Sequence, residues 1–568
     1  MPPDSKVISR SLKLTRSRNL EITCDCKEAF ECRNVIHKYE LDNSTELIKV
    51  PEMSSALAKH SAAAAYALVM VGIGLPVWWK TTEVYRAHLP YSDIDQLAEL
   101  DTRQRSDVFL VCFKERSADR IAPALQALLA RATEFSVSLN VRPARPSEKK
   151  MVESASTLEV LDAMLGKELV AASPGSLALV EVPDHLLPHS TNVLLGSHRL
   201  LYFSSYASSE ELAAMVVDTV LGEPQLAATR RALPLTTTSR RPPASGGGSK
   251  RTSGKLDLFL TLLVPQPEFV AASWDIELAT ETILSPFLES FPLEFSVKSQ
   301  VLYLTPLDIP ALNEGSGPIE LSPDQLGLAV NSVETALASQ ASSAPALNLL
   351  VYLPPVERQP LTIKGSQTDS FLIPRWGGVQ LYNFLGESET KFPLTVDLDM
   401  TRVAGVWLSQ LRSLLGVQEP NLPALPLPGL GMRNWELDFQ LRQRSLQYSL
   451  ESISTLTSLS HLLSQIPNIV ISDEVGGRVE GAMEKVSKGC RLVNKGSLLQ
   501  GFEASQNALQ LAEDAFFDKS LLALLYFPED QKYAIYIPFF LPVGIPVLLS
   551  LKTIVRFFKG ELVKPKTD

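Results

Sequence analysis

The chain has 568 residues, which is enough for two or three domains with substantial cores. Its formal net charge of −10 gives no reason to expect nucleic acid as a partner. The cysteines, three of which cluster at Cys24, Cys26 and Cys32, form neither a disulfide framework nor a zinc site, because the cluster lacks a histidine pair at ligand spacing.

Residues 1–52 show no clear pattern, and we expect them to form a disordered prefix. After a short segment at 53–60, residues 61–79 read SAAAAYALVMVGIGLPVWW and carry no charge. A helix needs about 20 predominantly apolar residues to cross a bilayer. The alternative is a secretory signal peptide, but the segment ends in a tryptophan pair followed by Lys80 rather than at a small-residue cleavage site. We therefore predict a transmembrane helix over 61–79.

Aromatic residues at and after the end of this segment fit the interfacial belt of a membrane helix. In such a belt the apolar body and the polar edge of each ring lie at the level of the lipid headgroups. The candidate membrane-interface residues are Trp78, Trp79, Tyr85 and Tyr91. They indicate that the chain leaves the bilayer here and enters a large portion that spans residues 80–532.

This portion alternates short apolar runs with helical patterns. VFLVCF (108–113) and LNLLVYLP (347–354) predict strands, whereas APALQALLARA (122–132) and MTRVAGVWLSQLRSLLG (400–416) predict helices. Strands separated by helices indicate an α/β domain with a mixed or largely parallel sheet that helices cover.

A segment at about 228–255 interrupts the alternation. It is rich in Ser, Thr, Pro, Gly and positive charge, a composition that predicts a disordered loop. Because such a loop can lie on the surface of a single domain, we expect the halves on either side of it to share one sheet. No repeat of fixed period stands out. From about 435 to 530 the pattern predicts a helical layer.

The second long apolar segment, residues 533–551, reads YAIYIPFFLPVGIPVLLSL and predicts a second transmembrane helix. The tail at 552–568 is basic, so the positive-inside rule places it in the cytosol. Two spans then put both termini in the cytosol and residues 80–532 in the lumen. Lys564 and Lys566 resemble the dilysine signal that retrieves membrane proteins to the endoplasmic reticulum, with a solvated basic tail as the alternative.

Three prolines give the second predicted span an unusual face. Pro538, Pro542 and Pro546 recur every four residues and therefore line one side of a helix. Each proline removes a backbone hydrogen bond, a cost that is more readily met where a neighbouring helix or polar group contacts the freed carbonyl. We predict that this face packs against partner helices, and a proline-kinked solitary anchor is the alternative.

The sequence offers little for catalysis. It has no phosphate-binding glycine loop followed by lysine, no GxSxG elbow and no HExxH helix. His185 and His189 are four residues apart, but Pro188 disfavours the helix that would bring them together. Cys112 lies in an apolar strand pattern typical of a buried thiol, and its pairing with Cys490 is left open. We predict no catalytic residue, no metal site and no cofactor.

The stretch PRWGGVQLYN (374–383) places a tryptophan beside two glycines before a predicted strand. Arg375 and Trp376 are candidate subunit-interface residues, because Arg and Trp are enriched at binding hot spots. The favoured alternative is a tight turn in which the glycines supply positive φ while Trp376 covers a core, and the two roles can coexist.

Several blocks of sequence resemble one protein family. They are GLPVWWKTTEVYRAHLPY (74–91), WDIE (274–277), LNLLVYLP (347–354), PRWGGVQLYN (374–383), WELD (435–438) and SLLALLYFPEDQKYAIYIPFFLPVGIPVLLSL (520–551). Together they look like PIG-S, a family of non-catalytic subunits of the glycosylphosphatidylinositol (GPI) transamidase of the endoplasmic reticulum membrane. The resemblance runs from about Met53 to the C-terminus. Family members begin shortly before their first span, so residues 1–52 look like an atypical prefix.

The resemblance implies a structural role in a complex that attaches GPI anchors to the C-termini of proproteins. The nucleophilic cysteine and the histidine of that complex belong to another subunit, PIG-K, and the remaining subunits are PIG-T, GPAA1 and PIG-U. The implied partners of this chain are therefore these subunits and membrane lipid, with no nucleic acid. Two other classes stay open: a lumenal membrane-anchored hydrolase that uses Cys112 or the histidines His185 and His189, and a membrane-tethered binding module.

Overall fold

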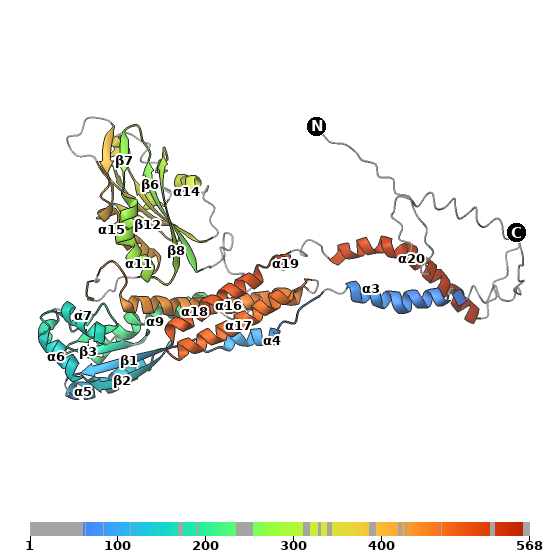
Figure 1. The fold of residues 1–568 in the computed structure, drawn as a ribbon, viewed down its shortest axis with the longest axis horizontal. Helices are drawn as coiled ribbons and strands as arrows, with labels where there is room; N and C mark the ends of the chain where they lie inside the picture. Colours follow the sequence, from blue (N-terminus) through green and yellow to red (C-terminus); the bar gives the residue numbers. More distant parts are fainter. Residues whose placement is uncertain are drawn as a thin grey trace, which may run out of the picture. The chain divides into compact units, whose positions relative to one another are not determined.

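A computed structural model of the chain describes most residues between 61 and 559. The described ranges are 61–62, 64–82, 85–113, 115–168, 174–188, 191–233, 254–309, 319–327, 331–337, 344–384, 393–417, 423–426, 429–466, 469–522 and 529–559. The described residues of 1–83 and 530–568 form a first unit, and those of 84–529 form a second (Figure 1). The predicted prefix, the segment at 53–60, Lys564 and Lys566 lie outside the described residues.

The first unit is helical. Residues 64–69 are α-helical, a π-helical turn follows at Met70–Gly74, and α3 occupies Leu75–Thr82. Near the other end of the chain, α20 extends over Glu529–Phe558. Among the described residues, no helix combines the length and the sustained apolarity that a bilayer crossing requires. The two predicted spans therefore stay predictions.

The first sheet of the second unit has five strands in the order β2-β1-β3-β5-β4, in which β4 alone is antiparallel to its neighbour. Its strands are β1 (Gln104–Cys112), β2 (Phe135–Pro143), β3 (Leu177–Glu181), β4 (Val193–Leu195) and β5 (Leu200–Phe203). Because side chains alternate along a strand, Leu110 and Val111 of β1 enter separate cores on the two faces. The covering helices are α5 (Glu115–Leu129), α8 (Ser209–Ala214) and α9 (Glu223–Ala232) on one face, and α6 (Pro146–Ser154) and α7 (Leu158–Glu168) on the other.

A second five-stranded sheet follows, in the order β12-β13-β10-β6-β8, with β12 alone antiparallel. Its strands are β6 (Lys255–Val264), β8 (Glu294–Tyr303), β10 (Ala346–Tyr352), β12 (Ser370–Ile373) and β13 (Gly377–Leu381). On one face α10 (Ile276–Ala279), α11 (Ser285–Ser290) and α15 (Met400–Leu414) close a core around Phe287 and Trp407, and α13 (Pro323–Leu326) and α14 (Asn331–Leu337) lie on the other. Two small parallel pairs, β9–β11 (Ile319–Leu321, Leu361–Ile363) and β7–β14 (Val270–Ser273, Leu394–Asp397), flank this sheet.

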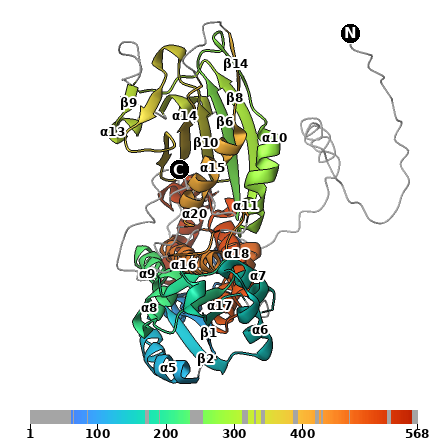
Figure 2. The ribbon, with the colours of Figure 1, turned by 90° about the vertical axis from the view of Figure 1, so that its left-hand side faces the viewer.

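The two sheets have the same topology. In each, the first strand along the chain (β1 or β6) has its successor on one side (β2 or β8) and the next parallel strand on the other (β3 or β10). In each, an antiparallel strand (β4 or β12) precedes and pairs with the parallel strand that follows it (β5 or β13). The expectation of one shared sheet is therefore wrong: the chain repeats a five-stranded arrangement, and the two copies lie apart (Figure 2).

The start of the predicted loop at about 228–255 also needs correction. Helix α9 continues to Ala232, and β6 already begins at Lys255. Residues 234–253 lie outside the described residues. The loop prediction began too early because the helical pattern of α9 extends into the polar segment, whereas its end agrees with the start of β6.

The helix-rich C-terminal part, predicted from about residue 435, is confirmed. It consists of α16 (Asn434–Gln465), α17 (Asp473–Asn494) and α18 (Leu498–Phe516). Their apolar faces share one core, to which the short helix α4 (Tyr91–Gln96) contributes Ile94. Close packing depends on small residues: a Cβ at Gly489 of α17 would lie 2.6 Å from Ser505 Oγ of α18.

Candidate functional site: a buried junction at the start of α16

The most concentrated group of buried charges lies where α16 begins. Arg433, Glu436, Asp438 and Arg442 belong to this helix and its N-cap, and each is nearly inaccessible to solvent. Trp435, in the same turn, donates its indole N–H to the carbonyl of Gly196, which precedes β5, at 2.9 Å. Together with Arg199 and Arg412, the four charged residues form what we call the α16 junction.

Glu436 connects α16 to the second sheet's helix α15. Its carboxylate accepts hydrogen bonds from the guanidinium groups of Arg412 and Arg433, each at 2.7 Å, and from the backbone N–H of Arg433 at 2.9 Å. The residue is 2 % exposed. A buried carboxylate with two guanidinium partners is fully paired, so these charges hold helices together instead of facing a ligand.

Asp438 connects the same helix to the first sheet. It accepts hydrogen bonds from Arg199 Nε at 2.5 Å and Nη2 at 2.8 Å, and from the backbone N–H of Gly175 at 2.9 Å. Residues 175 and 199 precede β3 and β5, so this contact lies at the amino ends of the parallel strands. One turn of helix therefore joins two sheet regions that the chain builds separately.

Arg442 lies one turn further along α16. Its guanidinium donates to the carbonyl of Gly175 and to Ser106 Oγ, and it stacks over the ring of Phe135 at 5.3 Å. Burial lowers the pKa of Arg442 to about 10, which leaves the side chain charged at neutral pH. The charge is held by carbonyl and hydroxyl oxygens and by the nearby carboxylate of Asp438.

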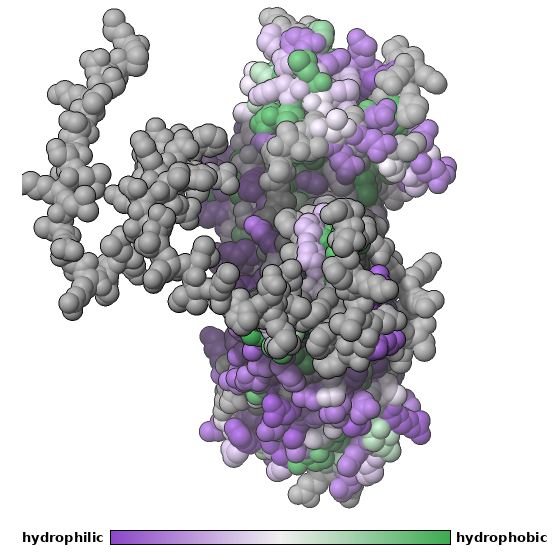
Figure 3. All heavy atoms as spheres, turned by 90° about the vertical axis from the view of Figure 1, so that its right-hand side faces the viewer, coloured by the Kyte–Doolittle hydropathy of each residue, from purple (hydrophilic) through white to green (hydrophobic). Residues whose placement is uncertain are grey.

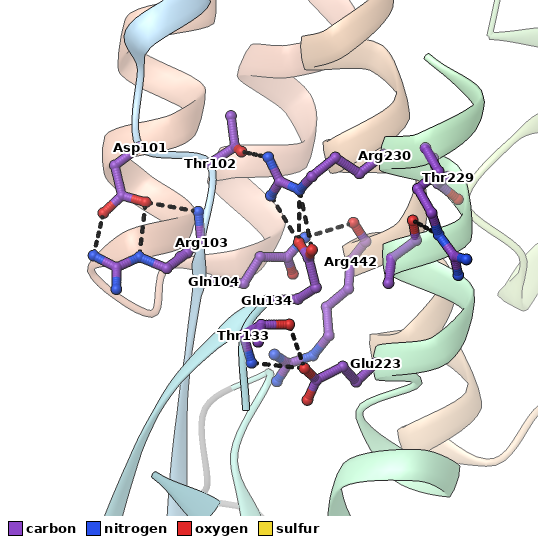
Figure 4. Close-up of polar contacts among 12 residues, drawn as sticks. Asp101, Thr102, Arg103, Gln104, Thr133, Glu134, Glu223, Thr229, Arg230 and Arg442 are labelled. Carbon is purple, nitrogen blue, oxygen red and sulfur yellow. Dashed lines mark hydrogen bonds and ion pairs between the residues drawn. The ribbon is translucent and has the colours of Figure 1, made fainter. Parts of the chain in front are cut away.

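A second set of polar contacts extends the junction along the amino ends of β1 and β2 (Figure 4). Arg230 of α9 donates to both carboxylate oxygens of Glu134 and, at 2.6 Å, to Thr102 Oγ1. Gln104 Nε2 donates to the carbonyl of Arg442 at 2.9 Å. Each strand start is thereby attached to a covering helix.

A buried carboxylate lies at the carboxyl end of β3, an edge of the sheet where α/β folds commonly bind ligands. Glu181 at the end of β3 accepts hydrogen bonds from the N–H of Phe113 at 2.8 Å and from Ser117 Oγ at 2.7 Å. Cys112 lies beside it, and burial together with the charge of Glu181 raises the pKa of that thiol to about 12. A thiol with this pKa stays protonated at neutral pH and is a poor nucleophile.

The other sequence candidates for chemistry are not assembled into a site. Cys112 and Cys490 are both free and buried, and they belong to different cores. His185 is exposed in a short 3₁₀ turn at Asp184–Leu186, whereas His189 lies outside the described residues. The described part of the chain holds no group of three His, Cys, Asp or Glu side chains that could bind a metal ion.

The structure does bring together a serine, a histidine and an aspartate that no motif in the sequence connects. Asp162 of α7 accepts hydrogen bonds from Ser197 Oγ at 2.7 Å, from His198 Nδ1 at 3.0 Å and from the hydroxyl of Tyr202 at 2.9 Å. A nucleophilic triad needs the serine hydroxyl on the histidine, but here Asp162 takes it. The group attaches the β4–β5 connection to α7.

The predicted membrane-interface residues fall in both units. Trp78 packs edge-on against Tyr536 and Phe540 of α20, with ring centroids 6.0 and 5.0 Å apart, and Trp79 is exposed. In the second unit, the hydroxyl of Tyr85 donates to Asp473 Oδ1 at 2.6 Å, and Tyr91 accepts from Arg86. The contacts of Tyr85 and Tyr91 attach the incoming chain to the helical core, and their place at a membrane interface stays a prediction.

The proline face of α20 is open. Pro538, Pro542 and Pro546 lie inside the helix and are exposed. Since each residue turns an α-helix by about 100°, a proline two positions from Tyr536 lies on the side away from the rings that contact α3. Among the described residues of the first unit, this face is therefore exposed.

Arg375 and Trp376 form the turn between β12 and β13. Trp376 is half-buried against the core under that sheet, as the alternative reading required, and Arg375 is exposed with φ near +65°. Gly377 also has a positive φ of +154°, but its main reason is contact: a Cβ there would lie 1.8 Å from the carbonyl oxygen of Asn348. The exposure of Arg375 is compatible with a subunit interface, which stays a prediction.

Comparison with known proteins adds an independent finding. The profile of the family described as "Phosphatidylinositol-glycan biosynthesis class S protein", PIG-S, matches residues 65–561. The human "GPI-anchor transamidase component PIGS" is 35 % identical over 539 residues, which cover 89 % of this chain and 97 % of that protein. The Schizosaccharomyces pombe "GPI transamidase component PIG-S homolog" is 24 % identical over 524 residues, 90 % of this chain and 86 % of its own.

Proposed function

This chain belongs to the PIG-S family, and from that membership we propose that it is a non-catalytic, structural subunit of the GPI transamidase complex. The observation that carries the proposal is the match to the human transamidase component over nearly the whole of both chains. We propose as its partners the catalytic subunit PIG-K together with PIG-T, GPAA1 and PIG-U.

The state of the candidate reactive groups supports a structural role. Burial and the charge of Glu181 raise the pKa of the Cys112 thiol to about 12, and Glu181 itself accepts hydrogen bonds from backbone and hydroxyl donors. Asp162 accepts the hydrogen bonds of both Ser197 and His198. In the α16 junction, Glu436 pairs with Arg412 and Arg433, and Asp438 pairs with Arg199. These arrangements favour cohesion of a scaffold over turnover of a substrate.

A cellular rescue experiment tests the non-catalytic role. Cells that lack this subunit are expected to lose GPI-anchored proteins from their surface, and the wild-type chain is expected to restore them. A Cys112→Ala/His185→Ala double variant is expected to restore them equally and to co-purify with the catalytic subunit, because neither side chain takes part in chemistry. A double variant that assembles normally yet restores nothing would instead favour the lumenal hydrolase.

We further propose that the chain resides in the endoplasmic reticulum membrane, with spans at 61–79 and 533–551, both termini cytosolic and residues 80–532 lumenal. The uncharged apolar segments, the basic tail and the dilysine-like Lys564 and Lys566 support this topology. The exposed proline face of α20 supports a contact with a partner helix in the membrane.

Protease digestion of sealed microsomes tests the topology. An epitope placed after the last residue is expected to be removed from the outside, whereas an epitope in the 80–532 portion is expected to survive until detergent opens the vesicles. Survival of the C-terminal epitope with loss of the internal one would reverse the orientation. Loss of both before detergent is added would show that the internal portion is not lumenal.

A further inference from the structure

Strand β8 forms one edge of the second sheet, and half of its backbone polar groups face outward. The N–H groups of Glu294 and Leu304 donate to Gly254 and Val264 on the side of β6, each at 3.0 Å. Because the polar groups of successive residues in a strand point to opposite sides, the even-numbered residues face β6 and the odd-numbered ones face away. The outward-facing residues are Phe295, Val297, Ser299, Val301 and Tyr303. No strand of the described chain pairs with this edge.

The edges formed by the antiparallel strands β4 and β12 differ from the β8 edge, because some of their outward-facing backbone groups already form hydrogen bonds. At the edge of the first sheet, Leu195 of β4 bonds to Pro423 and Leu425, so a crossing segment covers that strand. In β12 the side chain of Ser366 bonds to both the N–H and the carbonyl of Ser370. Both devices occupy polar groups that would otherwise attract another strand.

Strand β8 has fewer of the common protections against strand addition, although the carbonyl of Tyr303 accepts a hydrogen bond from Thr305 Oγ1 at 3.1 Å. It contains no proline, and its two charged side chains, Glu294 and Lys298, both pair with residues of β6. Its far end carries apolar side chains in solvent: Tyr303 is 58 % exposed, and Leu304, which follows the strand, is 71 % exposed. Figure 3 shows hydrophobic residues among hydrophilic ones on the part of the surface that holds this sheet.

We propose that an extended segment of another transamidase subunit adds to β8 as a sixth strand. The outward donors and acceptors alternate at the spacing of a strand, and the backbone of an extended polypeptide is the partner that matches them. The added strand would also cover exposed apolar side chains such as that of Val297. This proposal rests on the proposed function, because it requires a partner subunit, and it assigns the partner a backbone-directed mode of recognition.

A matched pair of variants at Ser299 separates backbone pairing from side-chain contact. Ser299 is exposed, and its N–H points away from β6. Proline is tolerated on an edge strand where the N–H faces solvent, but it removes the donor that an added strand would use. Ser299→Ala keeps that donor. In the co-expressed full complex, we expect Ser299→Pro to reduce recovery of the partner subunits at least tenfold and Ser299→Ala to leave it unchanged.

The readouts keep the two proposals apart. Failure of the wild-type chain to co-purify with the transamidase would overturn the proposed function, whereas normal recovery with folded Ser299→Pro would overturn strand addition alone. Where Ser299→Pro lowers the unfolding midpoint of the isolated full chain, Val297→Lys replaces it, because a charge on an exposed edge disfavours pairing without removing an internal bond. Amide exchange in the β8 peptide is expected to slow on assembly, and unchanged exchange, or a complex in which β8 meets a second copy of this chain, would contradict the proposal.

Discussion

Replacing Glu436 by alanine is expected to lower the free energy of unfolding of the second unit by about 3–5 kcal/mol. The change leaves the guanidinium groups of Arg412 and Arg433 buried without the carboxylate that each contacts at 2.7 Å. Removing one partner of a buried ion pair destabilises the fold by more than the intact pair stabilises it, because the remaining charge is buried away from water without a counter-charge. Denaturant unfolding of the full chain in detergent, followed by tryptophan fluorescence, measures the effect.

Glu474→Ala provides the matched control. Glu474 also pairs with an arginine on a helix, Arg478, but the glutamate side chain is 72 % exposed. An exposed pair of this spacing contributes about 0.5 kcal/mol or less. If the two alanine variants unfolded at the same denaturant concentration, the α16 junction would not be what holds α15 to α16, and the structural role assigned to it would fail.

The junction also shows what the sequence could and could not predict. The WELD block was recognisable as part of a family resemblance, and the helix beginning near it was predicted from periodicity. The partners were not, because Arg412 is 24 positions from Glu436 and Arg199 is 239 positions from Asp438. Hydrophobic periodicity reports the face that a residue occupies, whereas an ion pair between distant segments depends on the tertiary fold.

The same limit explains the two sheets. The apolar runs at 108–113 and 347–354 predicted strands, and β1 covers the first run up to Cys112 and β10 the second up to Tyr352. The sequence of a fully buried strand is apolar whichever strand it pairs with. The sequence therefore does not show which sheet the strand belongs to. The pairing of β6 with β8 and β10, and of β1 with β2 and β3, divides the strands at the polar segment that had been interpreted as an internal loop.

The reactive groups were easier to interpret. Cys112 was predicted to be a buried thiol from its place in an apolar run, and its burial is confirmed. The Asp162 group was missed because its members are some 35 positions apart in sequence and match no catalytic spacing. Its geometry also differs from that of a catalytic triad, because the aspartate accepts hydrogen bonds from both the serine and the histidine.

Gly377→Ala is the second substitution for which we expect a large effect, about 2–4 kcal/mol of destabilisation. A Cβ at this position would lie 1.8 Å from the carbonyl oxygen of Asn348, and the residue has a φ of +154°. Asn348 and Gly377 are register partners in the parallel pairing of β10 and β13, so relief requires the strands to separate. Because backbone atoms cannot rotate away as a side chain can, the cost falls on the centre of the second sheet. The unfolding midpoint of the full chain measures it.

Gly405→Ala tests whether the effect belongs to the site and not to the loss of a glycine. Gly405 lies within α15, where an added Cβ meets nothing within 4 Å. Alanine is favoured over glycine inside a helix by about 1 kcal/mol, so this variant is expected to be as stable as the wild type or more stable. Opposite shifts from the same chemical change would locate the requirement for glycine at the β10–β13 contact. If both variants shifted the unfolding midpoint equally in the same direction, the close approach of β10 and β13 would not explain the requirement for glycine.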